Sequence, residues 1–327
     1  MDTGTHLVIG LGLAGLSHID PVIAADSTLA TAVFIGTVLG QQAPDSDTLF
    51  RFRGNASYIK NHRGKSHSLP AIFLWTVLIT GLISWFFPAA SLFHLGLWVF
   101  IAVSLHVFID CFNAYGTQAA YPLTHRWISW NIIHIFDPVI FVGHVVAIMI
   151  WTFSLTKPEY IFSALYILLA LYYCWRTAVH YWLERSLPKQ DPEYQPGHKF
   201  FAIPTVKHSA WNVVKRIDAN SYRIGEYVNG RLRWLDKAVC SSHPAVEKSK
   251  ESKEIQAFTY FSSFACAEVK EHKWGFEVRW IDVRYRHRKQ YPFVGVLLMD
   301  PEYRILDSYV GWLSDERLEK RLRMDTY

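Results

Sequence analysis

Apolar residues are concentrated in the first half of the chain, where they form long stretches with few interruptions. The strongest stretch, 69–87, has nineteen residues and no charge, and a hydrocarbon core about 30 Å thick needs roughly 20 such residues. Two weaker stretches, at 7–25 and 27–39, precede it and are rich in Gly and Ala. Three further apolar stretches follow it, at 92–109, 135–155 and 160–183. This pattern predicts a mainly α-helical membrane domain of about six spans. The first two stretches, broken near Asp20-Pro21, are compatible with two thin spans or with a re-entrant pair.

The pattern changes to a period of two after a linker that contains four prolines. Asn229-Gly230 separates two alternating segments and is the strongest short signal for a β-hairpin. Further alternating segments follow, and the last two flank an Asp300-Pro301 turn. We therefore predict a membrane-embedded domain over 1–185, a linker over 186–204 and a small, soluble, antiparallel β-rich domain over 205–327.

Charge is distributed as this division requires. Residues 1–185 hold 9 Lys/Arg and 9 Asp/Glu, whereas the remaining 142 residues hold 24 Lys/Arg and 19 Asp/Glu. This asymmetry excludes a single soluble globule and a disordered protein. The four cysteines are scattered without a CxxC pair, so neither a zinc ribbon nor a disulfide scaffold is expected. The net charge of +5 is diffuse and does not support nucleic-acid binding.

Lys and Arg placement predicts the orientation of the spans. The loop over 40–68 carries five Lys/Arg, whereas the turns near 88–91 and 157–159 carry only Lys157. Because short cytoplasmic loops are rich in Lys and Arg, we expect this loop in the cytoplasm. The alternation of spans then places the loop over 110–134 and the β-rich domain there too. The sequence thus predicts a multi-pass cell-membrane protein, without a cleaved signal peptide, whose C-terminal domain is cytoplasmic.

Ionisable residues of the membrane half gather near the predicted cytoplasmic ends of the spans. Such groups are costly at membrane depth unless they face a cavity, a partner or a metal. His106 and Asp110 are four residues apart, so one helix face presents both, and His180 and Glu184 repeat this spacing.

Two loop motifs add further candidate ligands. Asp45 and Asp47 lie in a Pro-Asp-Ser-Asp turn, and His62 and His67 lie in the segment His-Arg-Gly-Lys-Ser-His-Ser. Each motif alone is more often a helix cap, a hydrogen-bonded pair or an interfacial group. Together on one side of the membrane they favour a metal site, and their nitrogen and oxygen ligands suit zinc, with manganese or iron as alternatives.

In these motifs and their order the chain resembles a family of metal-dependent hydrolases bound to bacterial inner membranes, the group named for a LexA-binding member. The resemblance covers roughly residues 1–150 and includes Thr5-His6; Ser66 stands where the group usually has Thr. More distantly, the ligand order is similar to zinc-dependent phospholipase C and P1-type nucleases, although these are soluble, exported and use an N-terminal Trp that is absent here. The two resemblances imply metal ligands among His6, Asp45, Asp47, His62, His67, His106, Asp110, His180 and Glu184.

These observations predict hydrolysis of an ester or phosphoester by metal-activated water. His106 and Asp110 would hold the metal, Asp45 and Asp47 would bridge it or orient the water, and His62 and His67 would be ligands or proton donors. Arg63, with Lys65, would offset the charge of a phosphate. A site at the membrane surface makes a lipid or lipid-linked substrate the natural expectation.

Two other functions fit the same pattern. A membrane-anchored regulatory or scaffold protein would keep a structural or vestigial metal site and bind a protein partner through its β-rich domain. A cation transporter fits less well, because the ionisable groups gather at one face and do not form a line through the spans.

Overall fold

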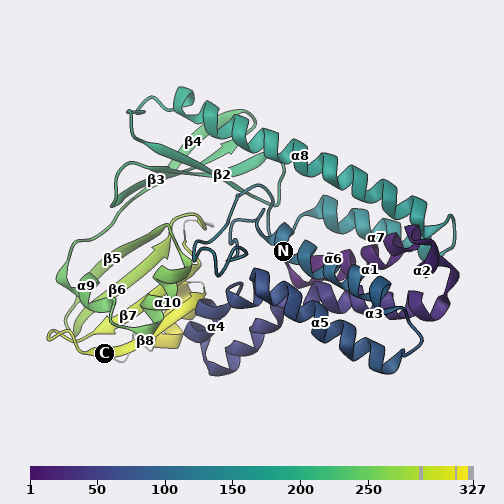
Figure 1. The fold of residues 1–327 in the computed structure, drawn as a ribbon. Helices are drawn as coiled ribbons and strands as arrows, with labels where there is room; N and C mark the ends of the chain where they lie inside the picture. Colours follow the sequence, from purple (N-terminus) through teal and green to yellow (C-terminus); the bar gives the residue numbers. More distant parts are fainter. Residues whose placement is uncertain (287–289, 314, 323–327) are drawn as a thin grey trace. The chain divides into compact units, whose positions relative to one another are not determined.

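The computed structural model describes residues 1–286, 290–313 and 315–322 (Figure 1). The chain divides into two compact units. The first contains Met1–Asp47, Arg63–Trp182 and Pro204–His208, and the second contains Thr48–His62, Leu183–Ile203 and the chain from residue 209 onward.

The first unit is helical. Its elements are α1 (Thr3–Leu16), η1 (Ser17–Ile19), α2 (Pro21–Ala25), α3 (Ser27–Gln42), the start of η2 (Pro44–Arg53), η3 (Lys65–His67), α5 (Leu69–Phe86), α6 (Leu92–Asp110), α7 (Pro138–Thr152) and most of α8 (Pro158–Gln190), where η marks a 3-10 helix. Local sequence sets the helix starts: the side chains of Asp20, Asp26 and Asp137 accept hydrogen bonds from the first backbone amides of α2, α3 and α7. The amide groups that begin these helices are thereby satisfied.

Helix α3 packs closely against α6 because of two glycines spaced four residues apart. A Cβ atom on Gly36 would lie 2.7 Å from Cγ2 of Val99, and one on Gly40 would lie 2.9 Å from Cβ of Ala102. Small residues at this spacing let helix backbones approach each other in membrane proteins. The close contact brings the end of α3 next to the end of α6, where ionisable side chains gather.

Three helices, α5, α6 and α8, are long and apolar enough to cross a membrane. The shorter apolar helix α7 has 15 residues, and α1 and α3 have 14 and 16. The prediction of a mostly helical N-terminal part is therefore confirmed, with three candidate membrane spans among the described residues, whereas six spans stay a prediction. The first apolar stretch gives no long helix because Asp20-Pro21 and Asp26 end one helix and begin the next.

The second unit contains two four-stranded antiparallel sheets, which confirms the predicted antiparallel β structure. In order they are β1 (Lys199–Pro204), β2 (Ala210–Arg216), β3 (Ser221–Val228) and β4 (Arg231–Val239), then β5 (Ala265–His272), β6 (Gly275–Asp282), β7 (Phe293–Met299) and β8 (Ile305–Trp312). The predicted hairpin joins β3 to β4, and Asn229 and Gly230 both have positive φ, 51° and 81°.

Helices α4 (Asn55–Asn61), α9 (Pro244–Ser249), α10 (Lys253–Phe261) and α11 (Asp315–Leu322) complete the second unit. The core over the second sheet includes Ile255 and Phe258 of α10 and Leu297 of β7. Ile59 of α4 is buried in the same core, although it comes from the loop between two apolar stretches. The second unit is thus built from residues on both sides of the helical part of the chain.

A disulfide joins Cys240 and Cys266 in the second unit, although their distant positions gave no sequence signal for it. The bond closes a loop with a sequence separation of 26 residues. A loop of this length implies about 3 kcal/mol of stabilisation through the unfolded chain. We therefore expect Cys266→Ala to lower the melting temperature of the second unit by several degrees, measured by calorimetry on the full chain in detergent. Cys174→Ser, which changes a free and exposed thiol, is the control; equal melting of oxidised and reduced wild type would contradict the expectation.

Candidate metal centre

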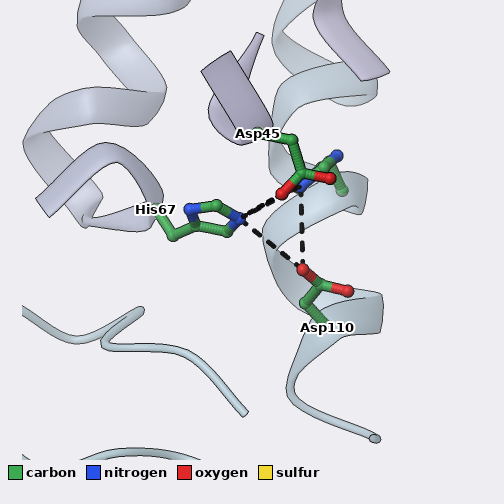
Figure 2. A group of neighbouring side chains, drawn as sticks. Asp45, His67 and Asp110 are labelled. Atoms are coloured by element: carbon green, nitrogen blue, oxygen red, sulfur yellow. Dashed lines mark hydrogen bonds and ion pairs between the residues drawn. The ribbon is translucent and has the colours of Figure 1, made fainter. Parts of the chain in front are cut away.

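Three segments of the first unit bring four ionisable side chains together. Asp45 lies at the start of η2, directly after α3, and His67 is the last residue of η3. His106 and Asp110 lie in the last turns of α6, where their spacing places both on one face of the helix. The ligand atoms of these four residues all lie within 4.8 Å of one another, and Figure 2 shows three of the residues, Asp45, His67 and Asp110.

The distances within this group match those between ligands of one small cation. Nε2 of His67 lies 3.2 Å from Nε2 of His106, 3.4 Å from Oδ1 of Asp45 and 3.6 Å from Oδ2 of Asp110. Nε2 of His106 lies 3.8 Å and 3.7 Å from the same two oxygens. Tetrahedral zinc with bonds of 2.0–2.1 Å separates its ligand atoms by about 3.3 Å. Two imidazole nitrogens and two carboxylate oxygens therefore surround a space of suitable size.

The two carboxylate oxygens of the group are short of hydrogen-bond donors. Oδ1 of Asp45 and Oδ2 of Asp110 are buried, and neither has a hydrogen-bond partner among the described residues. Burying an anionic oxygen without a hydrogen bond is costly, and Nη2 of Arg63, 3.4 Å from Oδ2 of Asp110, offsets only part of the charge of that carboxylate. These two oxygens point toward the histidine nitrogens (Figure 2) and are the observation that most directly favours a bound cation.

Hydrogen bonds fix the histidine rings with Nε2 turned to the centre. Nδ1 of His106 donates to the main-chain oxygen of Gln41, 2.7 Å away, so neutral His106 presents a lone pair on Nε2. Nδ1 of His67 lies 2.9 Å from Oγ of Ser66, which donates to Oδ2 of Asp47 at 2.6 Å. Metal-bound histidines usually donate their other ring N–H in this way. Asp47 therefore orients a ligand and is not itself a member of the four-residue group.

Burial and nearby charges also set the protonation states of His67 and Asp45, the two ligands from the loops, to those that bind a cation. Burial lowers the pKa of His67, which keeps the imidazole neutral and able to donate a lone pair. Burial alone would raise the pKa of Asp45, but the neighbouring side chain of His67 and the nearby positive charge of Arg63 lower the pKa below its ordinary value. The loop side of the site thus supplies a neutral nitrogen and a charged oxygen, as metal binding requires.

His6 and the amino group of Met1 lie against the group. The ring of His6 stacks on that of His106 with 3.7 Å between centroids, and its Nε2 lies 3.4 Å from Oδ1 of Asp110. The amino group of Met1 contacts Asp110 and lies 2.9 Å from Nε2 of His6. Gln41 accepts a hydrogen bond from Nδ1 of His6 through Oε1 and one from Nδ1 of His106 through its main-chain oxygen. The only sequence signal for Gln41 is a polar side chain at the end of an apolar helix.

Arg63 is held in an unusual position beside the group. It is 2% exposed and has a positive φ of 59°, and its main-chain N–H donates to Oδ2 of Asp47 at 2.8 Å. Nη2 donates to the main-chain oxygen of Met1 and lies 3.4 Å from Oδ2 of Asp110. Nε and Nη1 are buried without a hydrogen-bond partner in the described part of the chain. The guanidinium therefore has donors left for an anion.

The remaining candidates are not members of the four-residue group. His62 ends α4 in the second unit, where its ring stacks on Tyr58 at 4.7 Å. Glu184, also in the second unit, accepts a hydrogen bond from the main-chain N–H of Ala202. His180 is buried in α8, and its ring lies edge-on to Tyr181. Their assignment as ligands stays a prediction.

Comparisons with known proteins find family matches for the N-terminal and the C-terminal parts of the chain. The family described as "YdjM inner membrane protein" matches residues 1–183, and the family described as "YfhP C-terminal alpha/beta plait domain" matches residues 244–322. The chain is 39% identical over 328 residues to a Bacillus subtilis (strain 168) protein described as "Uncharacterized protein YfhP", and the match covers 99% of each chain. No solved structure matches.

Proposed function

This chain belongs to the YdjM inner membrane protein family, and we propose that it is a membrane-bound, metal-dependent hydrolase of an ester or phosphoester. The observation that carries the proposal is the group of Asp45, His67, His106 and Asp110, in which two buried carboxylate oxygens have no hydrogen-bond partner among the described residues. The predicted membership of a bacterial inner-membrane family is confirmed, whereas the likeness to metal-dependent hydrolases and to zinc-dependent phospholipase C is part of this proposal.

The four side chains divide into two roles by their exposure. His67, His106 and Asp110 are fully buried and would hold the ion, whereas the side chain of Asp45 is 14% exposed. Catalytic zinc sites have three protein ligands and one open position. A divalent ion in the site would lower the pKa of a water molecule towards neutrality. Asp45, at the exposed edge, would orient this water and accept its proton.

Arg63 favours a phosphoester over an uncharged ester. Its buried guanidinium lies 3.4 Å from Asp110, and two of its nitrogens, Nε and Nη1, have no hydrogen-bond partner among the described residues. Guanidinium donors bind phosphate oxygens well because they are planar and always charged. A phosphate beside Asp110 would receive hydrogen bonds that a carboxyl ester cannot accept as strongly.

A screen for turnover tests the proposal directly. Purified wild type loaded with Zn²⁺ or Mn²⁺ should hydrolyse at least one of four substrate classes: phosphomonoesters, phosphodiesters, phospholipids and carboxyl esters. Asp45→Asn should lose this turnover while it retains the ion. Absence of turnover with all four classes in metal-loaded protein would overturn the hydrolase.

A structural metal site is the second candidate, because four protein ligands around one ion are typical of sites without catalysis. The protein would then be a membrane-anchored regulator or scaffold, with the second unit available for a protein partner. Thermal stability separates the two proposals. A structural ion should raise the melting temperature of the first unit strongly, and Asp45→Asn should lower it as much as His106→Ala does.

We propose a multi-pass topology with the metal site and the second unit in the cytoplasm, based on the five Lys/Arg of residues 40–68. Lys60 and Ala89 are exposed and lie on either side of α5. In a Cys111→Ser, Cys174→Ser background, an impermeant thiol reagent should label Ala89→Cys in intact cells but Lys60→Cys only after permeabilisation. The background protein without an added cysteine is the control.

The reverse labelling pattern would place the site outside the cytoplasm. The disulfide between Cys240 and Cys266 argues for that outcome, because disulfides are rare in a reducing cytosol. Labelling of both positions from the same side would instead mean that α5 does not span the membrane.

A further inference from the structure

The loop between α6 and α7, residues 111–136, lies at the same end of α6 as the metal group. Hydrogen bonds between main-chain atoms fasten it there: Trp130 donates to the oxygen of Cys111 at 2.8 Å, and Gln118 donates to the oxygen of Arg63 at 3.0 Å. Cys111 directly follows α6, and Arg63 lies in the segment before α5. The loop therefore has a fixed place beside the end of α6 and the start of α5.

The tip of this loop carries an exposed leucine. Leu123 is 83% exposed, and every other large apolar side chain that is at least 60% exposed among the described residues of the first unit lies in one of the apolar stretches. A single exposed leucine is common on soluble proteins, so its neighbours decide what the exposure means. The neighbours of Leu123 in this loop are aromatic and cationic.

An aromatic side chain joins the loop to the exposed apolar surface of α6. Trp130 is 38% exposed, and its ring lies edge-on to those of Phe112 and Phe108, with 4.6 Å and 6.1 Å between centroids. Phe108 is 53% exposed and belongs to α6, which is long and apolar enough to cross a membrane. Tryptophan is enriched where such helices leave the hydrocarbon and meet the lipid headgroups. The position of Trp130 therefore favours a loop at the level of the headgroups.

Two exposed cations accompany Leu123. Arg126 lies three residues after it in the loop, and Nζ of Lys65 lies 5.9 Å from the ring centroid of Tyr121. Neither the loop nor residues 48–68, the segment that carries Lys65, contains Asp or Glu. The surface around Leu123 is therefore apolar at its tip, cationic beside it and free of acidic side chains from its own segments.

We propose that Lys65, Leu123, Arg126 and Trp130 form a surface that binds anionic phospholipids of the surrounding bilayer. Leu123 and Trp130 would lie among the upper acyl chains, and the two cations would bind the acidic headgroups. Apolar side chains interleaved with Lys and Arg are typical of segments that bind anionic membrane surfaces. A soluble anion would meet the cations but would leave Leu123 in water. The proposal rests on the proposed crossing of the membrane by α5 and α6, and it requires neither a bound metal nor hydrolysis.

Collision measurements with a nitroxide spin label test the proposal on the full chain in lipid nanodiscs. The label is attached to Leu123→Cys in the Cys111→Ser, Cys174→Ser background, and the discs contain phosphatidylcholine alone or an equal mixture with phosphatidylglycerol. Oxygen concentrates in hydrocarbon, whereas a neutral nickel chelate stays in water, so the ratio of their collision rates reports the depth of the label. We expect this ratio to be low in phosphatidylcholine and to rise several-fold when phosphatidylglycerol is present.

A label at Val77→Cys separates this proposal from the proposed topology. Val77 is 68% exposed in the middle of α5, so its label should show a high ratio in both kinds of disc if α5 crosses the membrane. A high ratio at Val77 with water-like collisions at Leu123 in both kinds of disc would contradict the lipid-binding surface alone. Water-like collisions at both positions would contradict the crossing by α5 as well.

Charge variants test the preference for acidic lipid. Each exposed cation near an anionic membrane surface is worth about a factor of five in the binding equilibrium, so Arg126→Gln and Lys65→Gln should each raise about fivefold the fraction of phosphatidylglycerol needed for half-maximal insertion. Lys157→Gln is the matched control, because Lys157 is 73% exposed in the turn between α7 and α8, at the opposite end of α7 from the loop. Its midpoint should equal that of wild type. If Lys65→Gln fails to fold, as judged by its melting curve, Arg126→Gln decides the question.

Three further results would overturn the proposal. A ratio at Leu123 that is high but does not change with phosphatidylglycerol would remove the preference for anionic lipid. Few collisions with either reagent would mean that protein covers Leu123. A loss of nickel collisions when glycerol phosphate is added to phosphatidylcholine discs would mean that the cations form a site for a soluble phosphate.

Discussion

Replacing His67 with alanine is expected to reduce any hydrolysis by this protein by about 10²–10⁴, the range of general acid–base or ligand contributions. His67 is fully buried, and its Nε2 faces the other three members of the metal group at 3.2–3.6 Å. Its removal takes one nitrogen ligand from the site. The measurement is the rate on the substrate that wild type turns over best.

Added metal distinguishes the two roles predicted for His67. If His67 is a ligand, as its position favours, excess Zn²⁺ or Mn²⁺ should restore part of the rate of His67→Ala. If it is the proton donor, metal should restore nothing, and the rate should respond to added imidazole. His94→Ala is the control, because His94 pairs with Asp20 near the start of α6. A rate for His67→Ala within threefold of wild type would remove the residue from the mechanism.

Metal affinity should fall in a graded series across the site. His106→Ala removes a ligand and should abolish measurable binding at micromolar metal. Asp47→Asn leaves the four residues of the metal group unchanged but removes the charge that orients Ser66 and, through it, His67. Loss of such an outer partner typically costs 10- to 100-fold in metal affinity.

Equilibrium dialysis with Zn²⁺ on each folded variant measures the series. His94→Ala should bind as wild type does, because the residue lies on α6 but at its other end. A reversed order, with Asp47→Asn weaker than His106→Ala, would mean that Asp47 is a direct ligand and that the arrangement of the site differs from the one described above.

Local spacing was enough to predict part of this site. The i, i+4 spacing of His106 and Asp110 follows from the geometry of any α-helix, so their common face is predictable from the sequence. The predicted topology also placed Asp45 and His67 on the same side of the membrane as His106 and Asp110. What the sequence does not contain is which carboxylate of the turn faces inward, because a 3-10 turn and its neighbours decide between Asp45 and Asp47.

Long-range contacts account for most of the rest. Ile59 is a single apolar residue in a charged loop, and only the folded second unit reveals that it belongs to a core with Phe258 and Leu297. The disulfide joins Cys240, directly after β4, to Cys266 within β5, and two short helices separate the two cysteines along the chain, so they gave no spacing signal. By contrast, Asn229-Gly230 dictates its own turn, and the sequence predicted that hairpin.

Metal content of the purified full-length protein tests the central proposal most directly. Mass spectrometry of wild type in detergent, after dialysis against Zn²⁺ and then against metal-free buffer, should find about one ion per chain. The same measurement should find no ion in His106→Ala, and the ion content of His94→Ala should equal that of wild type. Folded wild type that retains no divalent ion, or a His106→Ala variant that retains as much as wild type, would contradict a metal centre at Asp45, His67, His106 and Asp110.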